Sequence, residues 1–346
     1  MSDYELEIVN LKNQRRFAEV QSFLARFGLS FDLDVEYTVV LRQDDRLVAT
    51  GSFAGEVLRN FAVDETLQGT GLTATVVTAL MQEQARRGTY HYFIFTKPDK
   101  AQLFQAMGFA EIARAEPYVA LLETGLGSVH TYCESVQKET AHLVGNRAAL
   151  VVNCNPFTKG HEALIRQAAG ENEAVIIFVV SEDRSLFPFA DRLALVREGV
   201  AGLGNVAVVP AGKYMVSAAT FPAYFTREED KVVAQTRLDI TLFATRIAPE
   251  LGIRTRYVGE EPYCEVTNAY NEAMSLILPD KGIGLKTIPR FAVEGDVVSA
   301  SKVREALRSD DWAEVAKLVP ACTYEYLRKP STQPIIAKIR ESQSRH

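Results

Sequence analysis

A short run of residues at positions 153–161 has the residue types and spacing needed to bind a phosphate group. The run is Asn-Cys-Asn-Pro-Phe-Thr-Lys-Gly-His. Thr158, Lys159 and His161 can each donate a hydrogen bond to a phosphate oxygen, and Gly160 lets the backbone approach a ligand closely. Positioned donors and cations stabilise the charge that develops on phosphoryl oxygens during transfer. We therefore predict that Thr158, Lys159 and His161 are catalytic residues at a phosphate site.

The elements expected around this run place it where ligands bind in α/β proteins. A buried apolar strand is expected at 148–152 and a helix at 160–169, so the run forms a strand-to-helix turn. In a parallel sheet such a turn lies at the carboxyl edge, beside the free N–H groups and the positive end of the helix dipole. Pro156 stiffens the turn. Cys154 is expected to be a small buried thiol rather than a nucleophile.

A second motif at 298–304, Val-Ser-Ala-Ser-Lys-Val-Arg, is expected at another helix start. Together with Thr-Lys-Gly-His, it resembles the cytidylyltransferase-like nucleotidyltransferase superfamily, whose signatures are T/H-x-G-H and I-S-S-T-x-x-R. Val298, Ala300 and Ser301 depart from the second signature, and Thr158 replaces an imidazole present in many members. The resemblance implies that ATP is bound by these residues: Asn153, Asn155, Pro156, Phe157, Gly160, Ser299, Ser301, Lys302 and Arg304.

Each motif also has an ordinary structural interpretation. A His that follows Gly at a helix start, such as His161, is commonly a surface residue. Ser299 or Ser301 could be a plain N-cap, and Arg304 could lie on a solvated helix face. The order of the two motifs, their separation and the helix after each of them favour a nucleotide site over these interpretations.

The segment 259–271, Gly-Glu-Glu-Pro-Tyr-Cys-Glu-Val-Thr-Asn-Ala-Tyr-Asn, narrows the resemblance. With the first motif and the N-terminal part, it resembles the citrate lyase ligase family over nearly the whole chain. The resemblance adds Gly259 and Glu260 to the ATP-binding residues and implies that ATP and acetate form acetyl-adenylate. The acetyl group would then pass to the thiol of the CoA-like prosthetic group on the acyl carrier subunit of citrate lyase. Mg²⁺ is expected with ATP. No metal ligand is assigned, because Glu260, Glu261 and Glu265 could equally be plain loop acids.

An N-terminal motif at 63–73, Val-Asp-Glu-Thr-Leu-Gln-Gly-Thr-Gly-Leu-Thr, resembles motif A of the GNAT acetyltransferases. Residues 103–109, Leu-Phe-Gln-Ala-Met-Gly-Phe, resemble a later element of the same fold. Backbone N–H groups at such a helix start can hold a pyrophosphate. The CoA-like arm is therefore expected to bind at Gln68, Gly69, Thr70, Gly71, Leu72 and Thr73. The alternative is a fold retained for stability or docking, because the sequence shows no compelling general base.

The sequence predicts an α/β protein with two domains. Strands and helices are mixed before a seam at 123–128, and apolar strands alternate with helices after it, which is typical of a parallel sheet. We predict a mixed α/β, GNAT-like domain at 1–125. A Rossmann-like, cytidylyltransferase-like ligase domain is predicted at 126–346, and a helix at 128–142 connects the two. Expected elements later in the second domain are a loop at 224–235 and helices at 240–251 and 266–278.

Composition excludes several classes of protein. The chain has 346 residues, of which 47% are hydrophobic and 24% charged, with a net charge of −6. This balance is ordinary for a globular protein and lacks the basic face that nucleic acid binding needs. No apolar run approaches the roughly 20 residues of a membrane span, and the acidic N-terminus does not resemble a secretory signal, so a cytoplasmic protein is expected. The four cysteines are too widely spaced to suggest disulfides or zinc.

Three other functions remain open from the sequence. The main alternative is an adenylyltransferase that acts on a phosphorylated small molecule such as phosphopantetheine. The others are an acetyltransferase with a nucleotide-sensing domain and a non-catalytic nucleotide-binding regulator. Acetate-dependent release of pyrophosphate distinguishes the ligase from all three. Tyr214 and Arg256 are candidates for the carboxylate pocket, without an assigned role.

Overall fold

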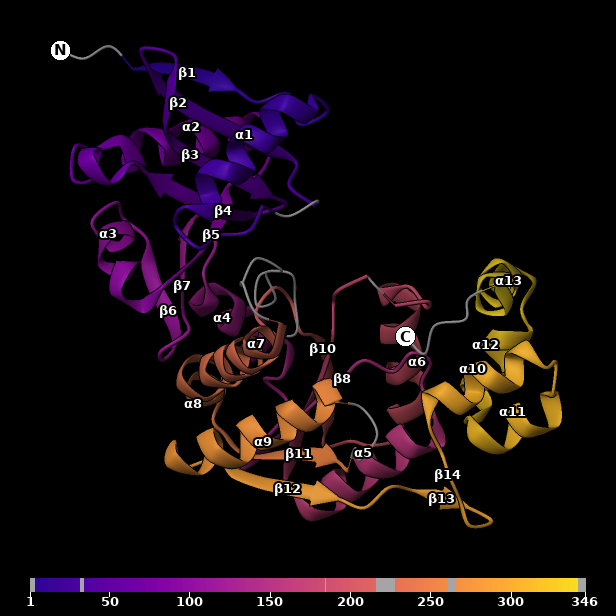
Figure 1. The fold of residues 1–346 in the computed structure, drawn as a ribbon. Coiled ribbons are helices and arrows are strands. Elements are labelled where there is room, and N and C mark those ends of the chain that lie inside the picture. Colours follow the sequence, from indigo (N-terminus) through magenta and orange to yellow (C-terminus); the bar gives the residue numbers. More distant parts are fainter. Residues whose placement is uncertain (1–3, 32–33, 184, 216–227, 261–264, 342–346) are drawn as a thin grey trace. The chain divides into compact units, whose positions relative to one another are not determined.

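The computed structural model describes residues 4–31, 34–183, 185–215, 228–260 and 265–341. The chain divides into two compact units (Figure 1). The first contains Met1–Thr131 and Ala218–Leu242, and the second contains Tyr132–Ser217 and Phe243–His346. The described part of the later segment, Glu228–Leu242, thus belongs to the first unit, although it follows the predicted boundary between residues 125 and 126.

The first unit is built on a seven-stranded mixed sheet with the order β1-β2-β3-β4-β5-β7-β6. All neighbouring strands are antiparallel except β4 and β5, which are parallel. The strands are β1 (Glu5–Ile8), β2 (Tyr37–Gln43), β3 (Arg46–Ala54), β4 (Val57–Val63), β5 (His91–Thr96), β6 (Ala110–Ala115) and β7 (Val119–Gly125). The helices between these strands are α1 (Gln14–Ala25) after β1, α2 (Leu72–Arg86) after β4, and α3 (Ala101–Gln105) after β5.

Side-chain alternation in β2 explains why both faces of this sheet are covered. Val39 and Leu41 point into the core that contains Val76 of α2, whereas Val40 points into a second core with Val20 of α1. Successive strand residues face opposite sides of a sheet, so one apolar strand supplies both cores. The strands predicted at 37–42, 47–53, 58–63 and 91–96 are confirmed.

Helix α7 (Glu228–Leu242) also belongs to the first unit, where it packs on β6 and β7. The predicted loop at 224–235 is wrong over 228–235, and residues 224–227 lie outside the described residues. The helix predicted at 240–251 is instead the end of α7, a π-helical turn at Phe243–Ile247 and α8 (Ala248–Leu251). Polar residues of α7 are buried beside apolar ones, for example Thr236 beside Leu238. No single apolar stripe therefore marks this helix in the sequence.

The second unit is built on a five-stranded parallel sheet with the order β10-β9-β8-β11-β12. The strands are β8 (Arg147–Val152), β9 (Ala174–Val179), β10 (Val206–Pro210), β11 (Ile253–Gly259) and β12 (Gly284–Ile288). The helices of this part of the chain are α4 (Val129–Glu139), α5 (Lys159–Glu171), α6 (Phe189–Val200) and α9 (Glu265–Asp280). Every residue of β9 is buried, as expected for a central parallel strand. The predicted fold class is therefore confirmed; strand β12 was not predicted.

The C-terminal part of the second unit is a small group of helices with its own core. It follows the hairpin of β13 (Ala292–Val293) and β14 (Asp296–Val297) and is coloured yellow to orange in Figure 1. Its core contains Val303, Leu318, Leu327 and Ile336. The helices are α10 (Ala300–Arg308), α11 (Trp312–Leu318), α12 (Ala321–Arg328) and α13 (Gln333–Glu341).

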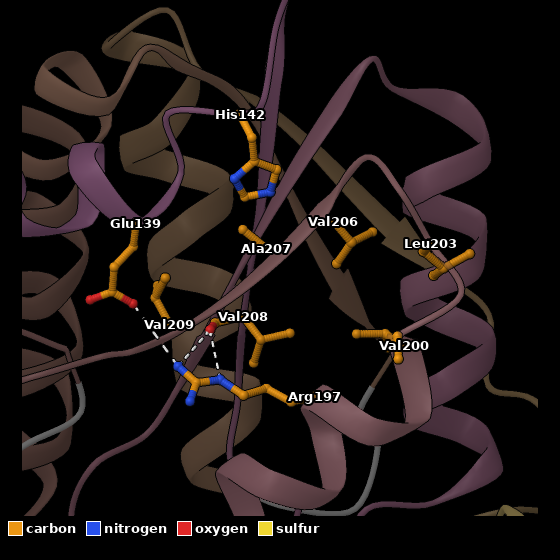
Figure 2. Close-up of a pocket in the computed structure, with 10 residues that line it drawn as sticks. Glu139, His142, Arg197, Val200, Leu203, Val206, Ala207, Val208 and Val209 are labelled. Atoms are coloured by element: carbon orange, nitrogen blue, oxygen red, sulfur yellow. Dashed lines mark hydrogen bonds and ion pairs between the residues drawn. The ribbon is translucent and has the colours of Figure 1, made fainter.

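Side chains bond to carbonyl groups of the edge strand β10. Arg197 donates from Nε and Nη2 to the carbonyl oxygen of Val208, at 3.2 Å each, and ion-pairs with Glu139 at 4.0 Å (Figure 2). The Tyr132 hydroxyl donates to the carbonyl oxygen of Pro210 at 2.9 Å. A hollow of about 340 Å³ lies over this edge. Covered carbonyl groups make an edge a poor template for another strand.

Candidate nucleotide-binding site

The strand order places a topological switch point between β8 and β11. The chain passes from β8 through α5 to β9 on one side, and later returns to β11 on the other side of β8. Ligands of open α/β sheets bind at the carboxyl ends of the strands where the order reverses. The turn at 153–158 follows β8, and Gly259 ends β11, so both predicted segments lie at this point.

The turn after β8 is largely buried. Asn155, Pro156, Phe157 and Thr158 are all buried, whereas Asn153 is exposed. The Asn155–Pro156 peptide bond is cis, and Cys154 has a φ of 54°. Burial raises the pKa of the Cys154 thiol well above its usual range, so the thiol stays protonated at neutral pH. The structure thus supports the prediction of a buried, unreactive thiol.

Thr158 and His161 form a reciprocal cap at the start of α5. The Thr158 hydroxyl oxygen accepts from the backbone N–H of His161 at 3.3 Å, and the backbone N–H of Thr158 donates to Nδ1 of His161 at 3.1 Å. A backbone N–H can only donate, so Nδ1 is the acceptor and the ring proton resides on Nε2. Burial lowers the His161 pKa from 6.5 to about 4. The imidazole is therefore neutral at neutral pH and has Nε2–H to donate.

The His161 ring rests on the ring of Phe157. The two ring centroids are 6.1 Å apart and the rings lie 17° from parallel. Phe157 is fully buried and fits against Gly199 of α6, where a Cβ atom would lie 2.3 Å from the ring. Only glycine at that position leaves room for the ring, so α6 sets the position of Phe157 beneath His161.

The second motif joins the first directly. Buried Arg304 donates from Nη1 to the carbonyl oxygen of Asn155 at 2.6 Å and from Nη2 to the Ser301 hydroxyl at 3.3 Å. At Gly160, a Cβ atom would lie 3.2 Å from the carbonyl oxygen of Val298. The structure therefore brings together two motifs that are more than 130 residues apart, and glycine allows their close approach.

The start of α10 adds a hollow with cationic side chains. The Ser299 hydroxyl caps the helix by accepting from the N–H of Lys302 at 3.2 Å. A hollow of about 340 Å³ beside it is lined by Arg290, Gly295, Asp296, Val297, Ser299 and Lys302. Free N–H groups at a helix start and nearby cations suit phosphate oxygens. Arg290 is the one lining cation that the sequence prediction omitted.

Two predicted phosphate ligands make other contacts in this structure. Nζ of Lys159 donates to the carbonyl oxygen of Ala316 in α11 at 3.0 Å, and Nζ of Lys302 pairs with Asp296 at 3.4 Å. Both contacts are exposed, and an exposed ion pair such as that of Lys302 with Asp296 contributes little to stability. Lys159 and Lys302 can therefore exchange these partners for a ligand at little cost.

The acidic segment after β11 is described only in part. Glu260 is exposed, and its backbone N–H donates to the carbonyl oxygen of Ile288 at 3.0 Å. Glu261 and the side chain of Glu265 lie outside the described residues. Within the described part of the chain, no group of three or more His, Cys, Asp or Glu could hold a metal ion. In the same part of the chain, no helix is long and apolar enough to cross a membrane.

The two carboxylate-pocket candidates are buried against aromatic rings. The ring centroids of Tyr214 and Tyr132 are 5.3 Å apart, and the Arg256 guanidinium lies 4.7 Å from the ring centroid of Phe243. Neither contact identifies a carboxylate site.

Comparison with known proteins decides the family. The family model described as "Citrate lyase ligase C-terminal domain" matches residues 147–327. A [Citrate [pro-3S]-lyase] ligase of Klebsiella pneumoniae is 37% identical over 92% of this chain and 94% of its own length. This chain belongs to the citrate lyase ligase family. A second member, from Escherichia coli K12, is 36% identical over 92% of both chains.

Membership in the citrate lyase ligase family makes this chain an enzyme of the ligase class. Among solved structures, Thermotoga maritima TmcAL bound with alpha-thio ATP matches 55% of this chain and 57% of its own. The identity is 16% and the TM-score is 0.36. At that TM-score the likeness supports no conclusion about ligand or function.

In the N-terminal unit, the segment at 68–73 that was predicted to bind a CoA-like arm lies at the start of α2. Gly69 and Gly71 have φ values of 80° and 90°, and α2 begins at Leu72 without a side-chain cap. The N–H groups of its first turn therefore have no partner within the helix. Residues 68–71 are exposed, whereas Leu72 is buried.

The sheet opens beside this segment. Strands β4 and β5 pair only at Val57 with Phe93 and at Leu58 with Ile94, near the start of β4. The motif at 68–73 follows the far end of β4, beyond its paired residues.

Proposed function

We propose that this enzyme activates acetate with ATP and transfers the acetyl group to a thiol, thereby activating citrate lyase. The acceptor is the CoA-like prosthetic group of the citrate lyase acyl carrier subunit. The names of the relatives, [Citrate [pro-3S]-lyase] ligases, support citrate lyase as the target. The observation that most supports ATP as the substrate is the hydrogen bond from Arg304 to the carbonyl oxygen of Asn155. This bond joins the motifs at 153–161 and 298–304 at the topological switch point of the sheet.

In the first step, an acetate oxygen attacks the α-phosphorus of ATP, and pyrophosphate leaves as acetyl-adenylate forms. His161 donates from Nε2–H to a phosphate oxygen, while Lys159 and Lys302 neutralise charge after leaving their present partners. Arg304 holds the Asn155 turn and the start of α10 together. Mg²⁺ forms part of the MgATP substrate, since this ion commonly binds through substrate phosphates.

In the second step, the thiol sulfur attacks the acetyl carbon, the bond to AMP breaks, and the thiol proton is released to solvent. The products are the acetyl thioester and AMP. The cradle of the N-terminal unit, at 68–73, is proposed to hold the CoA-like arm. Its glycine conformations and uncapped helix start support that role.

The test is ATP–pyrophosphate exchange with and without acetate. We expect exchange that requires acetate and that falls roughly 10²–10³-fold in His161→Ala, because one positioned donor is lost. Exchange that depends on phosphopantetheine instead of acetate would make this an adenylyltransferase and would remove the ligase proposal.

A further inference from the structure

Arg192 of α6 is a fully buried cation at the carboxyl edge of the second sheet, and no motif drew attention to it. Among the described residues, its guanidinium donates only to oxygen atoms of uncharged groups. Nε bonds the carbonyl oxygen of Phe187 at 2.9 Å, and Nη2 bonds that of Glu182 at 2.8 Å. Nη1 reaches the carbonyl oxygens of Val180 and Asn153 at 2.8 and 3.0 Å. The side chain thus connects the turn after β8 to the segment between β9 and α6.

Burying the charge of the Arg192 guanidinium costs free energy of desolvation, which its contacts must offset. Burial lowers the Arg192 pKa from its usual value, although a guanidinium stays protonated in proteins. Among the described residues Arg192 has no ion pair within 4 Å. The Asp183 carboxylate, whose charge acts on Arg192, instead accepts from the N–H of Phe189 at 2.7 Å. Polar contacts to fixed carbonyl groups must therefore offset the desolvation.

One contact of Arg192 involves a predicted ATP ligand. Nη1 donates to Oδ1 of Asn153 at 2.8 Å, and the Ser185 hydroxyl lies 3.2 Å from the same oxygen. A guanidinium has donors only, so Oδ1 and not Nδ2 must face it. Nδ2 of Asn153 donates to the Ser185 oxygen at 3.1 Å. The side chain of Asn153 is exposed, so the second Nδ2–H can donate toward the site.

We propose that Arg192 is a positioning residue that fixes the amide of Asn153 so that its second Nδ2–H, the one not donated to Ser185, faces the nucleotide. A freely rotating amide would present oxygen to the phosphates in part of the population, which would repel them. Holding one orientation removes that population before ATP arrives. Arg192 does not touch the ligand and acts through Asn153.

This inference rests on the proposed ATP site, so the test begins with ATP binding by the full chain. The dissociation constant of MgATP would be measured by calorimetry for the wild type, Arg192→Lys, Asn153→Ala and the double variant. We expect each single variant to weaken binding about tenfold, because one charge-assisted contact is lost. The double variant should bind as weakly as a single variant and no weaker, since both changes remove the same contact.

The controls separate positioning from general destabilisation. Arg197→Lys, on the exposed side of the same helix, should leave the dissociation constant unchanged. Unfolding temperatures of all variants would be compared. An additive, about hundredfold loss in the double variant would overturn the inference. So would an Asn153→Ala variant that binds ATP like the wild type.

A measurement without any change at Arg192 covers the case in which that variant does not fold. The Asn153 side-chain amide signals, assigned by their loss in Asn153→Ala, should shift in the wild type when ATP is added. Unchanged signals under saturating ATP would contradict the inference. A wild type that does not bind ATP would refute the proposed function itself, which is a different outcome.

Discussion

The protonation of His161 is the residue-scale property that most directly affects nucleotide binding. Burial lowers its pKa to about 4, so the imidazole is neutral at neutral pH. A bound triphosphate places negative charge beside Nε2 and favours the imidazolium. We expect MgATP binding at about pH 5.5 to take up a fraction of a proton, because the pKa rises on binding. Calorimetry in two buffers with different ionisation enthalpies measures this uptake, and uptake that persists unchanged in His161→Gln would assign it to another group.

The same residue should make stability depend on pH. The folded pKa of about 4 lies below the usual histidine value of 6.5, so the unfolded chain binds more protons between these values. The free energy of unfolding therefore falls as the pH drops from 6.5 toward 4, and the contribution of His161 is fully present above this window. Urea denaturation across the window should show a smaller decline for His161→Gln than for the wild type. Equal declines would show that His161 does not titrate in this way.

At the scale of elements, the position of α6 under the nucleotide turn is decided by Gly199. A Cβ atom there would lie 2.3 Å from the Phe157 ring, on which His161 rests. We expect Gly199→Ala to lower the free energy of unfolding by about 1–3 kcal/mol and to weaken the exchange reaction, because the ring must move.

The matched control for this substitution is Gly170→Ala in α5, where a Cβ atom meets nothing within 4 Å. Alanine in an open helical position should stabilise the protein by up to about 1 kcal/mol. Chemical denaturation and the exchange assay measure both variants. A Gly199→Ala variant that behaves like Gly170→Ala would refute the proposed role of α6.

At the scale of the whole molecule, the proposed reaction divides between the two units. Adenylate chemistry is assigned to the second unit and thiol binding to the cradle of the first. Gly71→Glu fills the cradle with a charged side chain at a φ of 90°. We expect acetate-dependent exchange to persist and acetyl transfer to the carrier to be lost, because the carboxylate repels a pyrophosphate.

Gly88→Glu is the control for backbone strain in the same unit. Gly88 has a φ of 84°, and a Cβ atom there also meets nothing within 4 Å, but it follows the opposite end of α2. Both variants carry a similar strain cost of about 1–2 kcal/mol. Equal acetyl transfer by the two variants, measured with the purified carrier, would show that the cradle does not bind the arm.

Local residue order determined a large part of this protein. The all-apolar run of β9 and the strand-to-helix turn at 153–158 were predicted because neighbouring residues alone set periodicity and turn chemistry. The motif at 68–73 likewise marked the turn that opens α2, where Gly69 and Gly71 have positive φ. These features depend on contacts only a few residues apart, and so they can be read from the sequence.

Tertiary structure decided what those local features become. Strand β12 and helix α7 lack a regular apolar pattern in the sequence. Contacts with segments far away in the chain decide which of their residues are buried. The contact of Arg304 with the Asn155 turn and the burial of Arg192 beneath Asn153 depend on strand order. The sequence by itself determined which residues could bind a phosphate. Only the packing of distant segments decided which of these residues are fixed in position, because burial and long-range hydrogen bonds exist only in the folded chain.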